Sequence, residues 1–178
     1  IVERYRHRIK KMDSSGNLIK TIGSYGYNQN GKFYYPTKID IDGNDNIYVS
    51  DNTRIQKLNS DGVWLKNFTG GQAARVRNLA VDQSGNVFVL NRQSTTSVCK
   101  WDSSGTFLNC WQCGEDCRGL SEHDGTLYAT ELRRGPKVIY WDSSSMRKKD
   151  YFWIDDNRYP YDLEVTSQGV YITNLYQN

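Results

Sequence analysis

The feature that most constrains this chain is an internal repeat of about 40–46 residues. An apolar residue followed seven positions later by a turn glycine or serine occurs in four similar copies, at residues 9–16, 55–62, 98–105 and 138–145. A second pattern is a short apolar run with an aromatic centre after a polar turn. Its four aromatic residues are Tyr48, Phe88, Tyr128 and Tyr171. Two interleaved units of this kind predict neighbouring copies that stack and share a core.

Each unit has the composition of a β-hairpin. Residues 42–46 and 82–86 read Asp-Gly-Asn-Asp-Asn and Asp-Gln-Ser-Gly-Asn, which tolerate positive φ between two apolar strands. Four short strands per repeat is the period of a propeller blade. A chain with 15 Gly, 13 Tyr and few Ala or Glu also favours turns and strands over helices. We predict an all-β protein, a β-propeller of four-stranded antiparallel blades rather than a β-sandwich, with no helix longer than a turn or two.

The repeat positions divide this single domain into blades. We expect a half-blade at 1–34, blades at 35–74, 75–117 and 118–159, and a half-blade at 160–178. The N-terminal half-blade would supply the second hairpin of a blade, with strands near 4–12 and 17–23. The C-terminal half-blade would supply the first hairpin. Two interpretations stay open. Either the halves pair and close a four-bladed ring without exposed edges, or the chain is part of a larger, six-bladed ring.

Residues 35–62 resemble a known family. They contain Tyr-Pro-Thr-Lys-Ile-Asp-Ile-Asp-Gly, then Asn46-Ile-Tyr-Val-Ser-Asp51, then Arg54-Ile-Gln-Lys-Leu58 and Asp61-Gly62. This succession of proline, apolar strand, turn, apolar strand ending in Asp, Arg-Ile-Gln and Asp-Gly is similar to an NHL repeat, and the other blades match in part. The Asn-His-Leu-type segment of the family is missing, because Asn52-Thr53 is short and lacks the histidine. The resemblance implies a propeller fold but no particular activity.

Residues suited to catalysis are sparse. The chain has two histidines, His7 and His123, whereas an NHL-like propeller enzyme, the peptide-amidating lyase, binds zinc at the central axis through several histidines. The turns carry recurring carboxylates, which we expect to close Asx-type turns: Asp13, Asp42, Asp61, Asp82, Asp102 and Asp142. The sequence contains no nucleophile elbow and no phosphate-binding glycine-rich loop. We therefore predict no enzymatic activity and no cofactor.

All four cysteines lie in one hairpin and the loop after it, at Cys99, Cys110, Cys113 and Cys117. An even number so confined predicts two disulfides, with a four-thiolate metal site as the alternative. The spacing favours disulfides because a second knuckle-like pair is missing. Strict hairpin register leaves Cys99 and Cys110 two residues out of line, so their pairing needs a β-bulge, and Cys113 then pairs with Cys117. Disulfides would place the protein in an extracellular or luminal space.

One further sequence feature is compatible with secretion. Asn67-Phe-Thr69 is a glycosylation sequon that we expect to follow directly after a strand.

A basic segment and an aromatic cluster form the expected binding surface. Arg4, Arg6 and Arg8 alternate with Tyr5 and His7, so as a strand they would share one face. The aromatic residues near the first blade crossing are Tyr25, Tyr27, Phe33, Tyr34 and Tyr35. Such a surface could stack RNA bases or bind protein, where Tyr is enriched. The net charge is only +3, and the first eleven residues sum to +4 while the other 167 sum to −1. A nearly neutral body disfavours nucleic acid as the partner.

These observations predict a non-catalytic propeller that serves as an interaction scaffold, extracellular and part of a larger protein or assembly, with protein partners that the sequence does not identify. The first alternative is a single-stranded RNA-binding propeller of the NHL type, using the basic and aromatic face. The second is a lyase-like propeller enzyme. The apolar runs are too short for a membrane-spanning helix, so we expect no membrane insertion.

Overall fold

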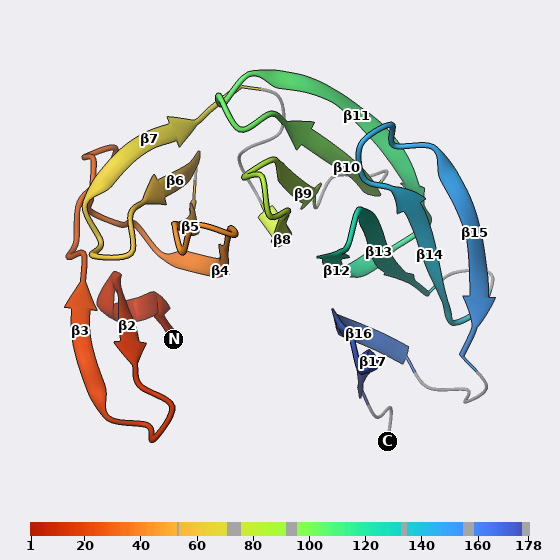
Figure 1. Ribbon diagram of the computed structural model, residues 1–178, viewed down its shortest axis with the longest axis horizontal. Helices are drawn as coiled ribbons and strands as arrows, with labels where there is room; N and C mark the ends of the chain where they lie inside the picture. The colour runs from red at the N-terminus through yellow and green to blue at the C-terminus, as the bar shows by residue number, and fades with distance from the viewer. Residues whose placement is uncertain (53, 71–75, 92–95, 133–134, 155–158, 176–178) are drawn as a thin grey trace.

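The computed structural model describes residues 1–52, 54–70, 76–91, 96–132, 135–154 and 159–175. Over these residues the chain forms five antiparallel sheets, arranged side by side along an arc (Figure 1). The helical content of this part of the chain is a single three-residue 3₁₀ segment, η1 (Arg4–Arg6). No helix that it contains could span a membrane. The prediction of an all-β chain is confirmed.

Three sheets have four strands each, and neighbouring strands in each sheet are consecutive in sequence. The first blade contains β4 (Pro36–Ile41), β5 (Ile47–Asp51), β6 (Arg54–Leu58) and β7 (Trp64–Phe68). The second blade contains β8 (Val76–Val81), β9 (Val87–Asn91), β10 (Thr96–Trp101) and β11 (Phe107–Gly114). The third blade contains β12 (Cys117–His123), β13 (Thr126–Glu131), β14 (Lys137–Asp142) and β15 (Lys148–Trp153).

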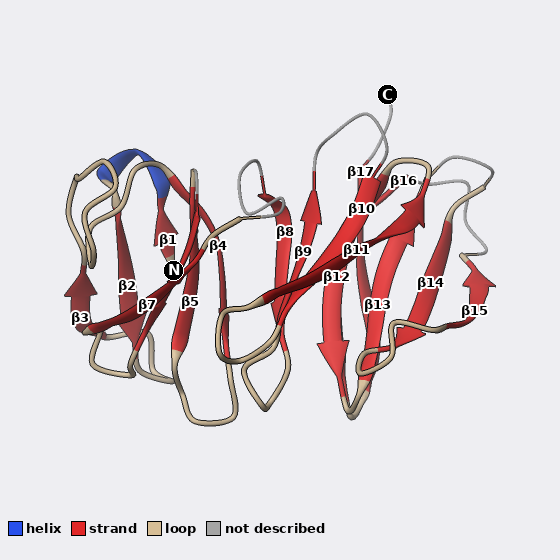
Figure 2. Ribbon diagram, turned by 90° about the horizontal axis from the view of Figure 1, so that it is seen from above, coloured by secondary structure: helices blue, strands red, loops and turns tan. Residues whose placement is uncertain are grey.

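The two terminal sheets are smaller. The N-terminal sheet contains β1 (Val2–Glu3), β2 (Arg8–Met12) and β3 (Leu18–Ile22), and the C-terminal sheet contains β16 (Tyr159–Thr166) and β17 (Gly169–Leu175). Strands β4, β8, β12 and β16 pack beside one another and are the inner strands of the arc, while β7, β11 and β15 lie on its outside (Figure 1). In Figure 2 the strands stand side by side and the turns gather at their two ends.

The apolar core lies between adjacent sheets. One buried cluster joins the N-terminal sheet to the first blade and includes Ile9, Ile22 and Val49. A second joins the first and second blades, and a third joins the second and third blades. Each sheet therefore depends on its neighbours for burial of its apolar side chains, as the repeat predicted.

The repeated turns are closed by acidic side chains. Carboxylates accept backbone N–H groups within their own turns at Asp13, Asp42, Asp82, Asp102 and Asp142. Asp61 does not have this role, contrary to the expectation. In that turn Asn59 Oδ1 accepts the N–H groups of Asp61 and Val63, at 3.1 and 2.9 Å, because Asn59 occupies the first position of the turn.

The N-terminal segment differs from the strand that the alternation predicted. Residues 4–6 form η1 and His7 has a left-handed backbone with φ 53°, so β2 begins only at Arg8. The basic residues consequently do not share one face of a strand. Glu3 offsets part of their charge, since its carboxylate pairs with Arg8 and lies 3.4 Å from Lys10 Nζ.

Two of the expected blade boundaries differ from the strand bounds of the structure. Cys117 begins β12 and Tyr159 begins β16, whereas we expected each to end the preceding blade. The expected boundary at 74/75 lies outside the described residues.

The two half-blades do not join into one blade. They form separate sheets at the two ends of the arc (Figure 1). The four-bladed ring closed by their pairing is thus not the arrangement of this structure.

Candidate functional site

The inner strands place polar side chains around the axis of the arc. Lys38 on β4 forms an ion pair with Asp162 on β16, with Nζ 3.0 Å from Oδ2. Asn78 on β8 donates from Nδ2 to the other carboxylate oxygen of Asp162 at 2.7 Å. These three residues, called here the axial lock, connect inner strands that are up to about 120 residues apart in sequence. Two cavities adjoin the lock, and Lys38 and Asp162 line both of them, whereas Asn78 lines only the larger one.

The larger cavity, called here the channel chamber, has a volume of about 580 Å³ and is lined by the inner strands. Its walls carry Asp40, Glu122 and Glu164, with His123 nearby. Burial raises the pKa of Asp40 to about 6, and the negative charges of Glu164 and Glu122 add to the shift. Burial also raises the pKa values of Glu122 and Glu164. The chamber is therefore an acidic region whose carboxylates hold protons more tightly than in water.

The smaller cavity, called here the channel mouth, has a volume of about 270 Å³ and lies at the beginnings of the inner strands. Its wall combines cations, an aromatic ring and two residues of the lock: Arg4, Thr37, Lys38, Val76, Arg77, Arg118, Tyr161 and Asp162. Asp116 accepts from Arg77 Nη1 at 2.7 Å and from Arg118 Nη2 at 3.0 Å. The buried Nε of Arg118 has no hydrogen-bond partner among the described residues. An unpaired buried donor of this kind favours an acceptor from a ligand.

Arg4 connects the mouth to an aromatic cluster in the N-terminal region. Its guanidinium lies 5.7 Å from the ring centre of Tyr5 and 6.0 Å from that of Tyr35. His7 is central to the cluster, because its Nδ1 accepts the N–H of Tyr35 at 3.1 Å and its ring stacks on Tyr34. Tyr25 packs edge-on against His7.

Most of the expected binding surface is brought together, with one correction. Tyr25 and Tyr27 are exposed, and Tyr34 and Tyr35 are half-buried. Phe33 is fully buried in the core between the N-terminal sheet and the first blade. Its ring lies so close to Gly23 that a Cβ there would be 2.3 Å from the ring, so Phe33 is a core residue rather than a surface one.

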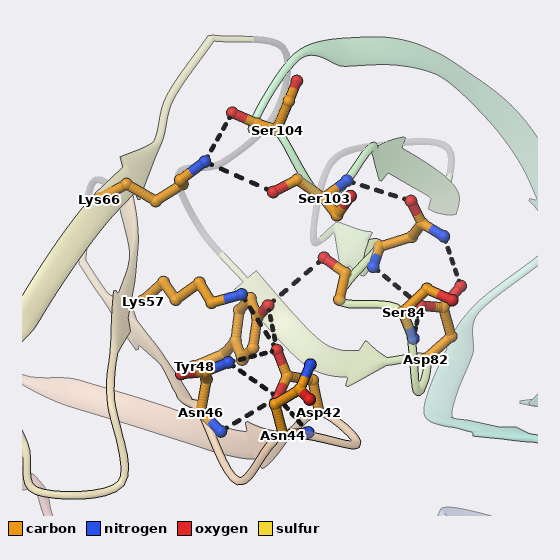
Figure 3. Close-up of polar contacts among 12 residues, drawn as sticks. Asp42, Asn44, Asn46, Tyr48, Lys57, Lys66, Asp82, Ser84, Ser103 and Ser104 are labelled. Carbon is orange, nitrogen blue, oxygen red and sulfur yellow. Dashed lines mark hydrogen bonds and ion pairs between the residues drawn. The ribbon is translucent and has the colours of Figure 1, made fainter.

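Polar contacts at the other ends of the blades hold neighbouring blades together (Figure 3). The hydroxyl of Tyr48 donates to Asp42 Oδ2 at 2.9 Å and reaches the carbonyl of Gly85 in the second blade at 3.4 Å. Burial alone would raise the pKa of Asp42, but hydrogen bonds from Asn46 and Lys57 outweigh it and hold the pKa at about 2. This carboxylate is therefore charged and structural, and is not suited to acid–base chemistry at neutral pH.

The cysteines are paired as the sequence predicted. The sulfur atoms of Cys99 and Cys110 are 2.00 Å apart, and those of Cys113 and Cys117 are 2.15 Å apart. Cys99 lies directly opposite Cys110 because the register of β10 and β11 shifts between Lys100 and Trp101, which is the expected bulge. The pairs belong to different core clusters, so the four sulfurs do not converge on one metal position.

Asn67 lies within β7 rather than after a strand. Its side chain is already engaged, since Nδ2 donates to Asn30 Oδ1 at 2.9 Å and Oδ1 accepts from Trp64 Nε1 at 3.0 Å. The glycosylation of Asn67 stays a prediction.

The axial lock and three cations of the mouth, Lys38, Arg77 and Arg118, were not predicted from the sequence, whereas Arg4 was part of the expected binding surface. Lys38, Arg77 and Arg118 are isolated charged residues at the starts of three strands, separated by about 40 residues each. Aligning the repeats by strand register would have placed Arg77 with Arg118, and Lys38 with Asn78 and Asp162. This alignment was the available signal.

Comparison with known proteins identifies the architecture. No family profile and no curated protein matches the sequence. Among solved structures, the WD40 repeats of RRP9 are 18% identical over 79% of this chain and 43% of that chain, with a TM-score of 0.61. A catalytically inactive His-to-Ala variant of virginiamycin B lyase from Staphylococcus aureus, with quinupristin, is 14% identical over 97% of this chain and 58% of that chain, with a TM-score of 0.69. The chain has a β-propeller fold.

Identities this low establish the fold alone. The propeller covers 43% and 58% of the length of these two neighbours, so it corresponds to about half of each. Both neighbours are propellers, but neither is identified as an NHL protein, and membership of the NHL family stays a prediction.

Proposed function

We propose that this propeller is a non-catalytic interaction scaffold that binds an acidic segment of a partner protein at the channel mouth. The convergence of cations from different sheets on one cavity carries the proposal. Arg4, Arg77 and Arg118 come from η1, the second blade and the third blade. Together with Lys38 they outnumber the two carboxylates that neutralise them, Asp116 and Asp162. Arginine and exposed tyrosine beside each other are typical of protein interfaces.

Three observations support a scaffold over an enzyme or an RNA-binding protein. The two histidines are separated, with His7 in the aromatic cluster and His123 in the channel chamber. The recurring turn carboxylates are occupied by backbone hydrogen bonds. The charge outside the N-terminal segment is close to neutral, whereas RNA binding depends on many cations. The two cysteine pairs at disulfide distance support an extracellular or luminal location.

The test uses peptides of defined charge. We expect a fluorescent octaglutamate peptide to bind and an octalysine peptide not to bind, as measured by anisotropy. Arg118→Ala should weaken binding by about tenfold, because the loss of a charged hydrogen bond from a buried donor costs about 1–3 kcal/mol. Arg4→Ala should weaken binding less, because Arg4 is exposed and an exposed ion pair is worth about 0–1 kcal/mol. Arg147→Ala is the matched control, since Arg147 is exposed in the turn between β14 and β15. Equal binding of the two peptides would refute the proposal.

The same assay separates the alternatives. Tight, salt-sensitive binding of an oligouridylate in preference to the peptide would favour the RNA-binding function. The lyase neighbour provides the other probe: incubation with quinupristin, followed by mass spectrometry, should leave the compound intact. Cleavage of quinupristin would establish the lyase function instead.

A further inference from the structure

The channel mouth is built from one repeated irregularity of the inner strands. In each inner hairpin the strand register shifts near the start of the first strand, at a site that includes Thr37, Arg77, Arg118 or Tyr161. All four residues line the mouth. A β-bulge re-aims the side chain at the irregular position and often lies beside a functional site. The bulges therefore direct a recurring set of side chains to the mouth, and two neighbouring members of that set are arginines.

One carboxylate of the chain already lies between these two arginines. Asp116 Oδ1 accepts from Arg77 Nη1 at 2.7 Å, and Asp116 Oδ2 accepts from Arg118 Nη2 at 3.0 Å. Burial alone would raise the pKa of Asp116, but the hydrogen bonds from both arginines outweigh it and lower the pKa. Asp116 is therefore charged at neutral pH and places one oxygen on each guanidinium. A carboxylate of a ligand would use the same N–H groups in the same way.

A short connection positions Asp116. Strand β11 ends at Gly114 and β12 begins at Cys117, so two residues connect the second blade to the third. Asp116 has a left-handed backbone with φ 59°, which is uncommon for a residue with a Cβ and persists where the surroundings hold it. The bridge between Cys113 and Cys117 closes around this residue. The carbonyl of Cys117 also accepts from Arg77 Nη1 at 2.6 Å, so the bridged segment supplies both of these acceptors of Arg77.

A second contact holds the other residue of the connection. Glu131 Oε1 accepts the N–H of Glu115 at 3.0 Å, and Glu131 Oε2 lies 3.0 Å from Lys137 Nζ. The Cys113–Cys117 bridge thus shares the positioning of Asp116 with Glu131. Loss of the bridge should displace Asp116 only in part.

We propose that Asp116 is a tethered competitor at the channel mouth. Its carboxylate occupies the N–H groups of Arg77 and Arg118 that a carboxylate of the partner would bind, and this lowers the affinity of the mouth for acidic segments. The Cys113–Cys117 bridge acts through Asp116, as a positioning element. The inference rests on the proposed function, because it concerns the regulation of the same site.

The opposite role for Asp116 would be to order the two guanidinium groups for the ligand. The two roles predict effects of opposite sign when Asp116 loses its charge. Competition predicts tighter binding of the ligand, because donors are released and a negative charge leaves the mouth. Ordering predicts weaker binding, because the arginines lose the group that fixes them.

The first test uses the fluorescent octaglutamate peptide. Asp116→Asn should tighten its binding by about fivefold, because a competing charge is removed. Asp124→Asn is the matched control, since it removes the same charge from a side chain that is 77% exposed in the turn between β12 and β13. It should leave the affinity unchanged. Weaker binding by Asp116→Asn, or an equal gain in both variants, would overturn the proposal.

The second test concerns the bridge. The Cys113→Ser, Cys117→Ser double variant should tighten binding by about twofold, less than Asp116→Asn, because Glu131 still holds the connection. The matched control is the Cys99→Ser, Cys110→Ser double variant, which removes the bridge in the core between the first and second blades. It should leave the affinity unchanged, and circular dichroism checks that both variants fold.

A double-mutant cycle shows whether the bridge acts through Asp116. In the Asp116→Asn background, removal of the Cys113–Cys117 bridge should give no further gain, because the competitor is already absent. A bridge that has the same effect with and without the Asp116 charge would overturn its role as a positioning element for this residue.

A measurement without the peptide separates this inference from the proposed function. Phenylglyoxal reacts with arginine side chains, and those of Arg77 and Arg118 are 22% and 27% exposed. Asp116→Asn should speed their labelling by about threefold, because a carboxylate no longer engages their N–H groups. Arg147, exposed between β14 and β15, is the internal reference. Unchanged labelling would overturn the inference. Faster labelling without peptide binding by any variant would support Asp116 as the occupant of the arginines and overturn only the proposed function.

Discussion

At the residue scale, the burial of an aromatic side chain depends on how its segment packs against the neighbouring sheets. Phe33 and Tyr27 are six residues apart in one aromatic-rich segment, yet Phe33 is fully buried and Tyr27 is exposed. The sequence shows both as aromatic residues near a blade crossing. Their difference arises because Phe33 fills the space between the N-terminal sheet and the first blade.

Phe33→Ala tests this assignment. We expect the variant to lose about 3–5 kcal/mol of unfolding free energy, because a large buried ring is replaced by a cavity. Tyr27→Ala should change the unfolding free energy by less than about 1 kcal/mol, since its ring is exposed. Urea unfolding followed by tryptophan fluorescence measures both values. Equal effects of the two substitutions would contradict the core role of Phe33.

The pH dependence of stability tests the chamber. The pKa of Asp40 is about 6 in the folded chain, against an ordinary value of 3.8. The folded chain therefore binds this proton more tightly than the unfolded chain, so the associated stability is fully present below about pH 4 and is lost as the pH rises through about 6. The unfolding free energy of the wild type relative to Asp40→Asn should fall by about 1–2 kcal/mol between about pH 4 and pH 7, allowing for partial solvent screening. Parallel pH profiles of the two proteins would show that Asp40 does not titrate in this range.

At the element scale, bulges and turns set which side chains meet across strands. The register shift after Lys100 brings Cys99 opposite Cys110, and similar shifts after Lys11, Lys57 and Tyr140 occur near the ends of the equivalent hairpins. The sequence predicted that the cysteine pair needs such a bulge. It did not indicate that the bulge is a general feature of these hairpins, because a shift of one residue depends on backbone hydrogen bonding and leaves little composition signal.

Thiol titration tests the cysteine pairs. We expect the denatured, unreduced protein to contain no free thiol. Reduction should lower the stability by about 2–3 kcal/mol per bridge in the chain-entropy estimate, because the closed loops are short. Hydrogen exchange should increase mainly at residues 110–118 and leave the first blade protected.

The Cys113→Ser, Cys117→Ser double variant is the control that removes one bridge only. It should retain the Cys99–Cys110 bridge and show the same local increase in exchange. Four reactive thiols without a bound metal would contradict both the bridges and the extracellular location.

At the scale of the whole molecule, the position of a sheet along the arc decides its stability. The second blade is packed on both faces, by the first and third blades, whereas the described residues of the C-terminal sheet pack mainly against the third blade. Stability in repeat proteins is approximately a sum over repeats and their neighbouring interfaces.

A gradient of hydrogen exchange along the chain should follow. Amides of β9 should be among the slowest to exchange and those of β17 among the fastest. Hydrogen exchange followed by mass spectrometry resolves these segments. Equal protection of β9 and β17 would contradict this gradient.

The sequence by itself determined the propeller fold, the positions of most strands and turns, and the pairing of the cysteines. These properties depend on interactions between residues near in sequence, such as the Asp42 turn or the Cys99–Cys110 hairpin. The turn and strand patterns also recur in each repeat, which strengthens the prediction. The tertiary structure alone decided which side chains meet at the axis, where Lys38, Asn78 and Asp162 converge from three sheets. It also decided the open arc, because closure depends on the angle between successive sheets, which their packed side chains set and no local pattern encodes.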